Sequence, residues 1–396
     1  MSNENSNSGT DVTIPPQWLQ QLIDFRRELH TYPELSGREV KTVNRILELL
    51  SETKPDSVLH PIGGNSLAFV YQGENPGPCT WLRCELDALP IPEDLQISYQ
   101  SVHEGVSHKC GHDGHMSMLA GVAFWLNVHQ VTNGKIVLLF QSAEETGEGA
   151  RAVVQDPLFA LHQPDYAFAL HNLPAYPLGR LLIKSGTFNC ASKGIIIRLT
   201  GHTSHAAHPE QGNSPLDAMC QIMKYVQELP DLAVPDQEVA FATVVHARLG
   251  EIAFGTSPAE AVVMATLRAE KNETVDMIYN SVRGFVNTIC LTLNLSVSWE
   301  EQDHFDASLN HPEAMKVLLG AGNKYNGLME VIHSPFRWSE DFGAISQRCR
   351  GAMFGIGAGE EVLPLHHPAY DFPDELIVFG MEAMIRMLCE LHQFEQ

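Results

Sequence analysis

Alternating strand-like and helix-like stretches most strongly limit what this chain can fold into. In the first half, the runs SLAFVYQG, CTWLRCEL, KIVLLFQ and YAFALH have the composition of strands. Between them, apolar residues recur at helical spacing, for example from Met116 to Phe124. Strands that alternate with helices are typical of an α/β domain with a mostly parallel sheet. At 396 residues the chain is too long for one ordinary core, so we expect two domains.

The middle of the chain has a different order of elements. Segments follow one another there as β-α-β-β-α-β, from KGIIIRLTG to LSVSWEE, which is the order of the ferredoxin-like split motif. We therefore predict an inserted α+β domain at residues 190–304. The larger α/β domain is expected to consist of residues 16–189 and 305–396. The polar residues 1–15 are expected to form a disordered leader.

The composition argues against some classes of binding partner. The chain has 48 acidic and 25 basic residues, and its formal net charge of −23 argues against nucleic acid or an anionic membrane surface. No apolar run approaches the ~20 residues needed to span a bilayer, and the N-terminus does not resemble a secretory signal. The eight cysteines are scattered without a C-x-x-C pair, as expected for reduced thiols in a cytoplasmic enzyme.

Titratable side chains follow three of the predicted strands. Asp87, Glu144, Glu145 and His171 are all expected just past a strand's C-terminal end. Ligands and active sites gather at that edge in open α/β sheets, so we expect these side chains to converge. Polar residues also begin many loops, and for any one strand this simpler interpretation is common. Three strands at once weaken it.

The stretch HKCGHDGH, residues 108–115, combines side chains that bind metals or move protons. Cys110 and His112 lie in the turn that enters a predicted helix, so both could reach one ion, and thiolate with imidazole suits zinc. Asp113 could orient an imidazole, and His115, on the same helix face as His112, would support rather than bind. By itself a C-x-H pair is weak evidence, and for the pair alone core residues are the favoured explanation.

Paired carboxylates in QSAEETGEGA could divide two tasks. Of Glu144 and Glu145, one could bind metal while the other holds a proton as general base. Acidic residues in the first turn of a helix are an equally good explanation for the pair alone. Histidines elsewhere complete a ligand set for two ions: Cys110, His112, Glu145, His171 and one of His366 or His367.

A further histidine cluster lies in the inserted domain. LTGHTSHAAHPEQG contains His202, His205 and His208. A histidine on a separate domain could close over a substrate and donate a hydrogen bond to a developing oxyanion. A polar surface loop is the simpler alternative.

With these residues assembled, the chain resembles the M20 peptidase family, and in particular its amidohydrolase branch of aminoacylases, hippurate hydrolases and auxin-conjugate hydrolases. HKCGHDGHMSMLAG is similar to the branch's H-x-C-G-H-D-x-H-x-x-x-L-x-G, and QSAEETGEGA to its Q-P-A-E-E-x-x-x-G-A. FRRELHTYPELSG, LRCELDALPI, GHTSHAAHP, SEDFG and LHHPAYDF match its other motifs in order. The resemblance covers nearly everything after the leader.

The resemblance implies a dinuclear-metal catalytic domain and a smaller lid domain through which the chain forms a homodimer. It implies two divalent ions, with zinc favoured and manganese, cobalt or nickel left open. His366 is preferred to His367 because the family's ligand directly follows the leucine, here Leu365. The implied ligands are Cys110, His112, Glu145, His171 and His366.

The resemblance also implies roles for residues that do not bind the metals. Glu144 would be the general base, and Asp87 a supporting or bridging carboxylate. His205 would bind substrate and stabilise the oxyanion, and Arg268 in TLRAE matches the family's substrate-binding arginine. The chain departs from the family at Gly255, where N-V-I-P has an asparagine that helps to hold the substrate's carboxylate end.

These features predict a metal-dependent amidohydrolase. It would cleave N-acyl amino acids or related small N-acyl compounds with metal-activated water and Glu144 as general base. A dipeptidase or aminopeptidase of the same family is an alternative. A non-catalytic metal-binding or sensor protein, or a thiol redox sensor built on Cys110, represents a different class.

Overall fold

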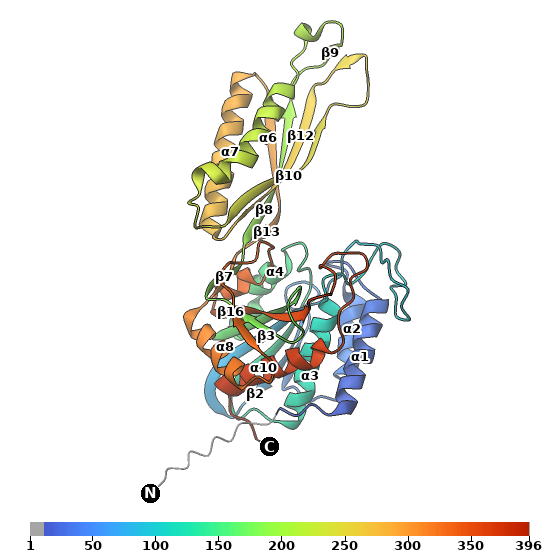
Figure 1. The fold of residues 1–396 in the computed structure, drawn as a ribbon, viewed down its shortest axis with the longest axis vertical. Coiled ribbons are helices and arrows are strands. Elements are labelled where there is room, and N and C mark those ends of the chain that lie inside the picture. Colours follow the sequence, from blue (N-terminus) through green and yellow to red (C-terminus); the bar gives the residue numbers. More distant parts are fainter. Residues whose placement is uncertain (1–11, 396) are drawn as a thin grey trace. The chain divides into compact units, whose positions relative to one another are not determined.

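The computed structural model describes residues 12–395, which form two compact units (Figure 1). The first unit contains residues 12–186, 309–333 and 344–395, and the second contains Thr187–Ser308 and Ser334–Gly343. Of the predicted leader, residues 1–11 lie outside the described residues, and the first helix begins at Pro16. None of the helices within residues 12–395 is long and apolar enough to cross a membrane.

An eight-stranded sheet forms the centre of the first unit. Strand β3 pairs in parallel with β4 and β5, β5 with β16, and β6 with β15, whereas β1, β2 and β4 pair antiparallel, as do β16 and β6. The predicted α/β fold with a mostly parallel sheet is therefore confirmed. In sheet order, the strands are β1 (Ser57–Leu59), β2 (Leu67–Gln72), β4 (Asn133–Gln141), β3 (Asn75–Glu85), β5 (Tyr166–Pro174), β16 (Arg350–Gly359), β6 (Leu181–Ile183) and β15 (Met329–Val331).

Helices cover this sheet. Helix α3 packs against α1 and α10, and α10 packs against α8. Helices α3 and α10 approach closely through glycines, since a Cβ on Gly121 would lie 2.3 Å from the Met381 sulfur. This packing fixes α3, the helix that follows the HKCG turn. The helices are α1 (Pro16–Thr31), α2 (Val40–Leu49), α3 (His112–Val128), α4 (Gly149–Gln155), α5 (Pro157–Leu161), α8 (Pro312–Lys324), α9 (Gly343–Ser346) and α10 (Leu376–Leu391).

The second unit has a four-stranded antiparallel sheet in the order β10-β12-β8-β13, with α6 and α7 packed against it. In β12, alternate residues are buried, so one face of the sheet meets the helices. This strand order is that of the ferredoxin-like split motif. The elements are β8 (Ala191–Thr200), α6 (Leu216–Ala233), β10 (Ala240–Leu249), β12 (Glu260–Ala269), α7 (Asn272–Thr292) and β13 (Ser296–Phe305).

Short elements complete the described chain. Strand β9 (Ser204–His205) pairs with β11 (Thr256–Ser257), and the 3-10 helix η1 (Pro209–Gln211) follows β9. Strands β7 (Gly186–Asn189) and β14 (Ser308–Asn310) lie where the chain passes from one unit to the other.

The segment Ser334–Gly343 belongs to the second unit, although the sequence-based boundaries group it with residues 305–396. Its Phe336 N donates a hydrogen bond to Phe188 O (2.8 Å), and its aromatic rings stack with a centroid distance of 5.2 Å between Phe336 and Trp338. Arg268 Nη1 donates to Ser339 Oγ (2.8 Å). Contacts between residues far apart in sequence thus decide where this segment packs.

Candidate metal centre

The parallel register places three strand ends at one edge of the first unit's sheet. Glu85 at the end of β3 lies opposite Gln141 at the end of β4, and Arg83 lies opposite Ala169 of β5. The segments that carry Asp87 and the paired glutamates therefore leave the sheet side by side.

His171 does not follow its strand, contrary to the prediction. It lies inside β5, because the pairing of β5 with β16 continues beyond it to Pro174, opposite Gly359. The side chain nevertheless reaches the other candidates. His171 Nε2 lies 3.4 Å from Cys110 Sγ.

All five predicted metal ligands are brought together in the structure. The ligand atoms of Cys110, His112 and His171 lie within 4.8 Å of one another, and so do those of Cys110, Glu145 and His366. Cys110 is common to both groups. Thiolate, imidazole and carboxylate in such groups could hold zinc or a similar divalent ion.

The two buried imidazoles are oriented by backbone carbonyl groups. His112 Nδ1 lies 2.8 Å from Asp87 O, and His171 Nδ1 lies 2.9 Å from Asn172 O, so in each ring Nδ1 carries the proton. The Nε2 lone pairs then face the other ligand atoms. A hydrogen bond at the second nitrogen of a ligand histidine is the usual arrangement at metal sites.

Among the predicted ligands, the surroundings of His112 fit a bound cation best. Its Nε2 is buried and, within residues 12–395, has no hydrogen-bond partner, while Glu145 Oε1 lies 3.9 Å away. A buried ring nitrogen without a hydrogen-bond partner is costly unless something satisfies it. Burial lowers the pKa of His112, but Asp87, Glu85 and Glu145 outweigh it and raise the pKa to about 10, so these carboxylates favour a positive charge at this position. A divalent ion bound by His112 and the neighbouring carboxylates would satisfy this nitrogen.

Burial affects the other histidines of the cluster. Burial lowers the pKa of His171 to about 3, with a further lowering by His115. Burial also lowers the pKa of His366, and His112 adds to this effect. A neutral imidazole is the form that binds a metal. His366 N also donates to Lys109 O (2.8 Å), which joins its loop to the turn that carries Cys110.

Asp87 is buried and supports the site through several contacts. Its Oδ2 accepts hydrogen bonds from Ser36 Oγ (2.7 Å) and from Glu145 N (2.9 Å). Its Oδ1 lies 3.6 Å from His112 Nδ1 and has no hydrogen-bond partner among the described residues. Burial raises the pKa of Asp87, but the nearby His112 ring and the hydrogen bond from Ser36 outweigh it and lower the pKa.

Glu144 lies beside the ligand groups. It is 5% exposed, and its Oε2 is 4.0 Å from His112 Nε2. The preceding Ala143 has a φ of +54°, a left-handed conformation that is rare for residues other than glycine, and its N–H donates to Glu39 Oε1 (2.8 Å). This strained turn after β4 lies directly before the paired glutamates, whose carboxylates both lie about 4 Å from His112 Nε2.

Other members of the histidine-rich stretches have different contacts. Asp113 bonds His30 Nδ1 (2.8 Å) and Arg26 Nη1 (3.2 Å), so it orients His30 rather than a ligand imidazole. Both ring nitrogens of His108 are buried and, within the described part of the chain, have no hydrogen-bond partner. The exposed His367 accepts a hydrogen bond at Nδ1 from Ala369 N (3.1 Å) and joins none of these ligand groups.

Two predicted substrate residues belong to the second unit. His205 lies on β9, is exposed, and accepts a hydrogen bond at Nδ1 from Ala207 N (3.1 Å). Arg268 lies on β12. Next to His205, Gly255 O accepts from Ala206 N (3.0 Å), and a Cβ on Gly255 would meet nothing within 4 Å. Space therefore does not require glycine at this position.

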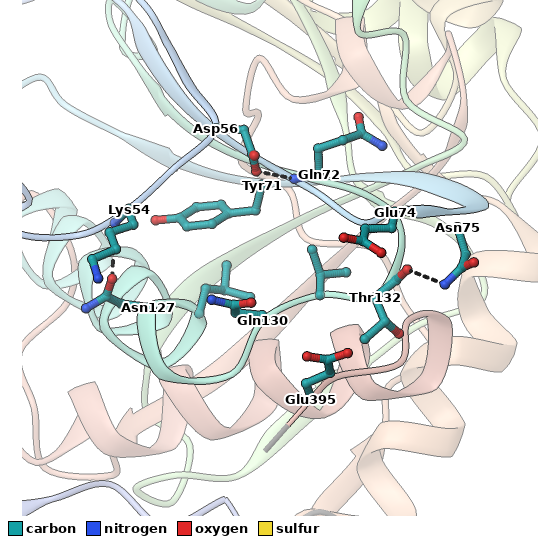
Figure 2. A pocket seen from close by; sticks show the side chains of 12 residues that line it. Lys54, Asp56, Tyr71, Gln72, Glu74, Asn75, Asn127, Gln130, Thr132 and Glu395 are labelled. Carbon is teal, nitrogen blue, oxygen red and sulfur yellow. Dashed lines mark hydrogen bonds between the residues drawn. The ribbon is translucent and has the colours of Figure 1, made fainter.

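A surface pocket of about 360 Å³ lies away from these residues (Figure 2). Residues that begin or precede β3 and β4, such as Asn75 and Thr132, line it, so it lies at the opposite strand edge. Its polar groups bond one another: Asn75 Nδ2 donates to Thr132 O (3.1 Å), and Asp56 Oδ2 accepts from Gln72 N (2.7 Å). None of the predicted site residues lines it.

Comparison with known proteins identifies the family to which this chain belongs. The profile of peptidase family M20/M25/M40 matches residues 81–390 of the chain. The chain belongs to the M20 peptidase family. The predicted family and the predicted reaction class are confirmed, and the chain is a metal-dependent amide hydrolase.

Similar proteins match nearly the whole chain. The chain is 31% identical over 383 residues to the N-acetyl-L-cysteine deacetylase of Bacillus subtilis, covering 93% of this chain and 88% of that protein. It is 28% identical over 351 residues to the N-acetyldiaminopimelate deacetylase of Priestia megaterium, covering 88% and 92%. A solved Bacillus subtilis structure described as a dinuclear metal binding peptidase of the M20 family has the same fold, with a TM-score of 0.79 at 23% identity over 94% of this chain and 98% of that one.

Proposed function

We propose that this M20 family protein removes the acyl group from N-acyl amino acids or related small N-acyl compounds, using two divalent ions held in the first unit. The buried Nε2 of His112, without a hydrogen-bond partner among residues 12–395 and facing two glutamates, is the observation that carries the metal site. The relatives named as deacetylases of N-acetyl-L-cysteine and N-acetyldiaminopimelate support the substrate class.

Cys110, His112, Glu145, His171 and His366 would hold the ions, and Asp87 would bridge or support them. Divalent ions bound there would polarise the substrate carbonyl and make water acidic enough to attack at neutral pH. A cysteine ligand favours zinc among the possible metals.

Glu144 would handle the proton in this reaction. Its carboxylate is buried beside the ligand groups and could accept a proton from the attacking water. It would then deliver that proton to the leaving nitrogen, so the amine departs uncharged. The strained turn at Ala143 would hold the carboxylate in place for both transfers.

The second unit is proposed to act as a lid and as the surface of a homodimer. Strand β10 lies at the edge of its sheet, with unpaired backbone groups available for another chain. His205 would donate to the oxyanion, and Arg268 would bind the substrate's carboxylate end. The eight free cysteines are compatible with the cytoplasm, which we propose as its compartment.

A substrate panel tests the proposal. Protein stripped by a chelator and reloaded with Zn²⁺, Mn²⁺ or Co²⁺ would be offered acetyl, benzoyl and longer acyl amino acids, each with a free and with an amidated carboxylate. We expect hydrolysis only after reloading. Because Arg268 would still bind the carboxylate end while Gly255 replaces the family's asparagine, we expect the free-carboxylate form to be preferred only modestly. Faster cleavage of free-amine dipeptides than of every N-acylated compound would contradict the proposal.

A further inference from the structure

Four buried polar side chains form a hydrogen-bonded chain next to the predicted ligands. His115 Nδ1 lies 2.6 Å from Glu85 Oε2, and His115 Nε2 lies 2.7 Å from Asn172 Oδ1. Asn172 Nδ2 donates to the Tyr370 hydroxyl. All four residues are fully buried. We call this set, Glu85, His115, Asn172 and Tyr370, the Glu85–Tyr370 chain.

The negative charge of Glu85 is balanced by a buried arginine. Its carboxylate is paired with Arg83, whose Nε donates to Gln141 Oε1 (2.9 Å). The ion pair with Arg83 and the 2.6 Å contact with His115 Nδ1 hold the Glu85 carboxylate and the imidazole together.

Each member of the Glu85–Tyr370 chain lies within four residues of a predicted site residue. The ligand-bearing segments come from different strands, a helix start and a loop, so no local interaction fixes their spacing. The Glu85–Tyr370 chain connects these segments through hydrogen bonds between residues next to the predicted site residues. The pairs are Glu85 with Asp87, His115 with His112, Asn172 with His171, and Tyr370 with His366.

Asn172 makes the central contacts. Its backbone O accepts the hydrogen bond from His171 Nδ1 (2.9 Å), which sets the ring of that ligand. Its side chain packs against Gly111, where an added Cβ would lie 2.8 Å from Asn172 Oδ1. Gly111 has a φ of +93° and lies between Cys110 and His112. One amide thus holds the ligand turn against β5.

We propose that the Glu85–Tyr370 chain, centred on Asn172, is a positioning scaffold that sets the spacing of Cys110, His112 and His171 and so determines metal affinity. This inference rests on the proposed metal centre. It assigns Asn172, His115, Glu85 and Tyr370 a role in positioning ligands, without contact to substrate. Residues that orient metal ligands commonly change metal affinity by about 10–100-fold when removed.

Asn172→Leu tests the scaffold, with Asn310→Leu as its matched control. Both are buried asparagines in the first unit that make several side-chain hydrogen bonds; Asn310 bonds Lys184 O (2.9 Å) and Met353 O (2.7 Å), away from the ligands. Stripped proteins would be titrated with Co²⁺ while the absorption of thiolate-bound cobalt is followed. We expect Asn172→Leu to bind Co²⁺ about 10–100-fold more weakly, and Asn310→Leu to bind as wild type.

The milder Tyr370→Phe variant keeps the test decisive if Asn172→Leu does not fold. It removes only the hydroxyl that Asn172 Nδ2 contacts, and we expect Co²⁺ affinity to fall by about tenfold. Wild-type affinity in the folded Asn172→Leu variant, or in Tyr370→Phe, would overturn the scaffold, as would an equal loss in Asn310→Leu. Because cobalt binding needs no substrate, a wild type that binds cobalt but hydrolyses no N-acyl amino acid would refute only the proposed function.

Discussion

At the scale of single residues, backbone carbonyl groups decide which imidazole nitrogen faces the other predicted ligands. Asp87 O accepts a hydrogen bond from His112 Nδ1, and Asn172 O accepts one from His171 Nδ1. Nε2 of each ring therefore points toward the other predicted ligands. The motif predicted the histidines as ligands. It could not predict the nitrogen used, because that depends on the ring orientations and on Asp87 O, which comes from a segment 25 residues before His112.

Glu144→Gln is expected to retain metal and lose turnover by about 10²–10⁴-fold, since the amide cannot accept the proton of the attacking water. Steady-state hydrolysis of an N-acyl amino acid, together with metal content by mass spectrometry, would measure both effects.

Glu148→Gln is the matched control for Glu144→Gln. It lies four residues further on, is exposed, and precedes α4. We expect its activity and metal content to equal those of wild type. Normal turnover in Glu144→Gln would show that another group takes the proton.

At the scale of elements, the start of α4 holds the segment that carries the paired glutamates. A Cβ on Gly149 would lie 1.7 Å from Ser142 O, a backbone atom that cannot move aside cheaply. We therefore expect Gly149→Ala to lower the free energy of unfolding by roughly 2–3 kcal/mol, measured by urea denaturation.

Gly284→Ala provides the contrast. Gly284 lies within α7, and a Cβ there would meet nothing within 4 Å. The substitution should stabilise the protein by roughly 0.5–1 kcal/mol because alanine favours helix. If Gly149→Ala were equally benign, the close approach of α4 to the β4 turn would not matter for stability.

A buried charge network joins α1 to the start of α3. His30 bonds Asp113 Oδ2 and Glu93 Oε1, both at 2.8 Å. Burial alone lowers the pKa of His30, but these two carboxylates outweigh it and raise the pKa to about 9. A histidine whose pKa is higher in the folded state than the usual 6.5 stabilises the protein fully below about pH 6.5. That contribution is lost as the pH rises through 9.

His30→Gln is therefore expected to be most destabilising near pH 6, by on the order of 3 kcal/mol, and least near pH 10. Urea denaturation at several pH values would measure the difference from wild type. The exposed His103→Gln serves as control and should differ little at any pH. A constant difference for His30→Gln across this range would contradict the role of the charged imidazole.

At the scale of the whole molecule, all five predicted metal ligands belong to the first unit. Ions that bind only the folded state stabilise it by mass action, by about 4 kcal/mol when the free ion is at 1,000 times its dissociation constant. We expect a chelator to lower the Tm of the first unit's calorimetric transition and to leave that of the second unit unchanged. Equal shifts in both transitions would show that the ions do not act through the first unit alone.

Much of the architecture could be predicted from the sequence because its signals are local. The helix from His112 onward and the β-α-β-β-α-β series appear where periodicity placed them. The position of Ser334–Gly343 could not be predicted, because its packing depends on Phe188 and Arg268, far away in the sequence. The sequence places His171 after its strand, whereas the structure places it within β5, because only the partner strand β16 shows how far β5 continues.

The sequence by itself determined the types and the order of the chemical groups: a cysteine, histidines and paired glutamates at recognisable spacings. Only the tertiary structure decided which of them meet, since parallel pairing of β3, β4 and β5 brings distant segments to one edge. It also revealed Asn172 and Tyr370, two ordinary residues in sequence. Their role depends on hydrogen bonds between segments about 200 residues apart, which no local pattern records.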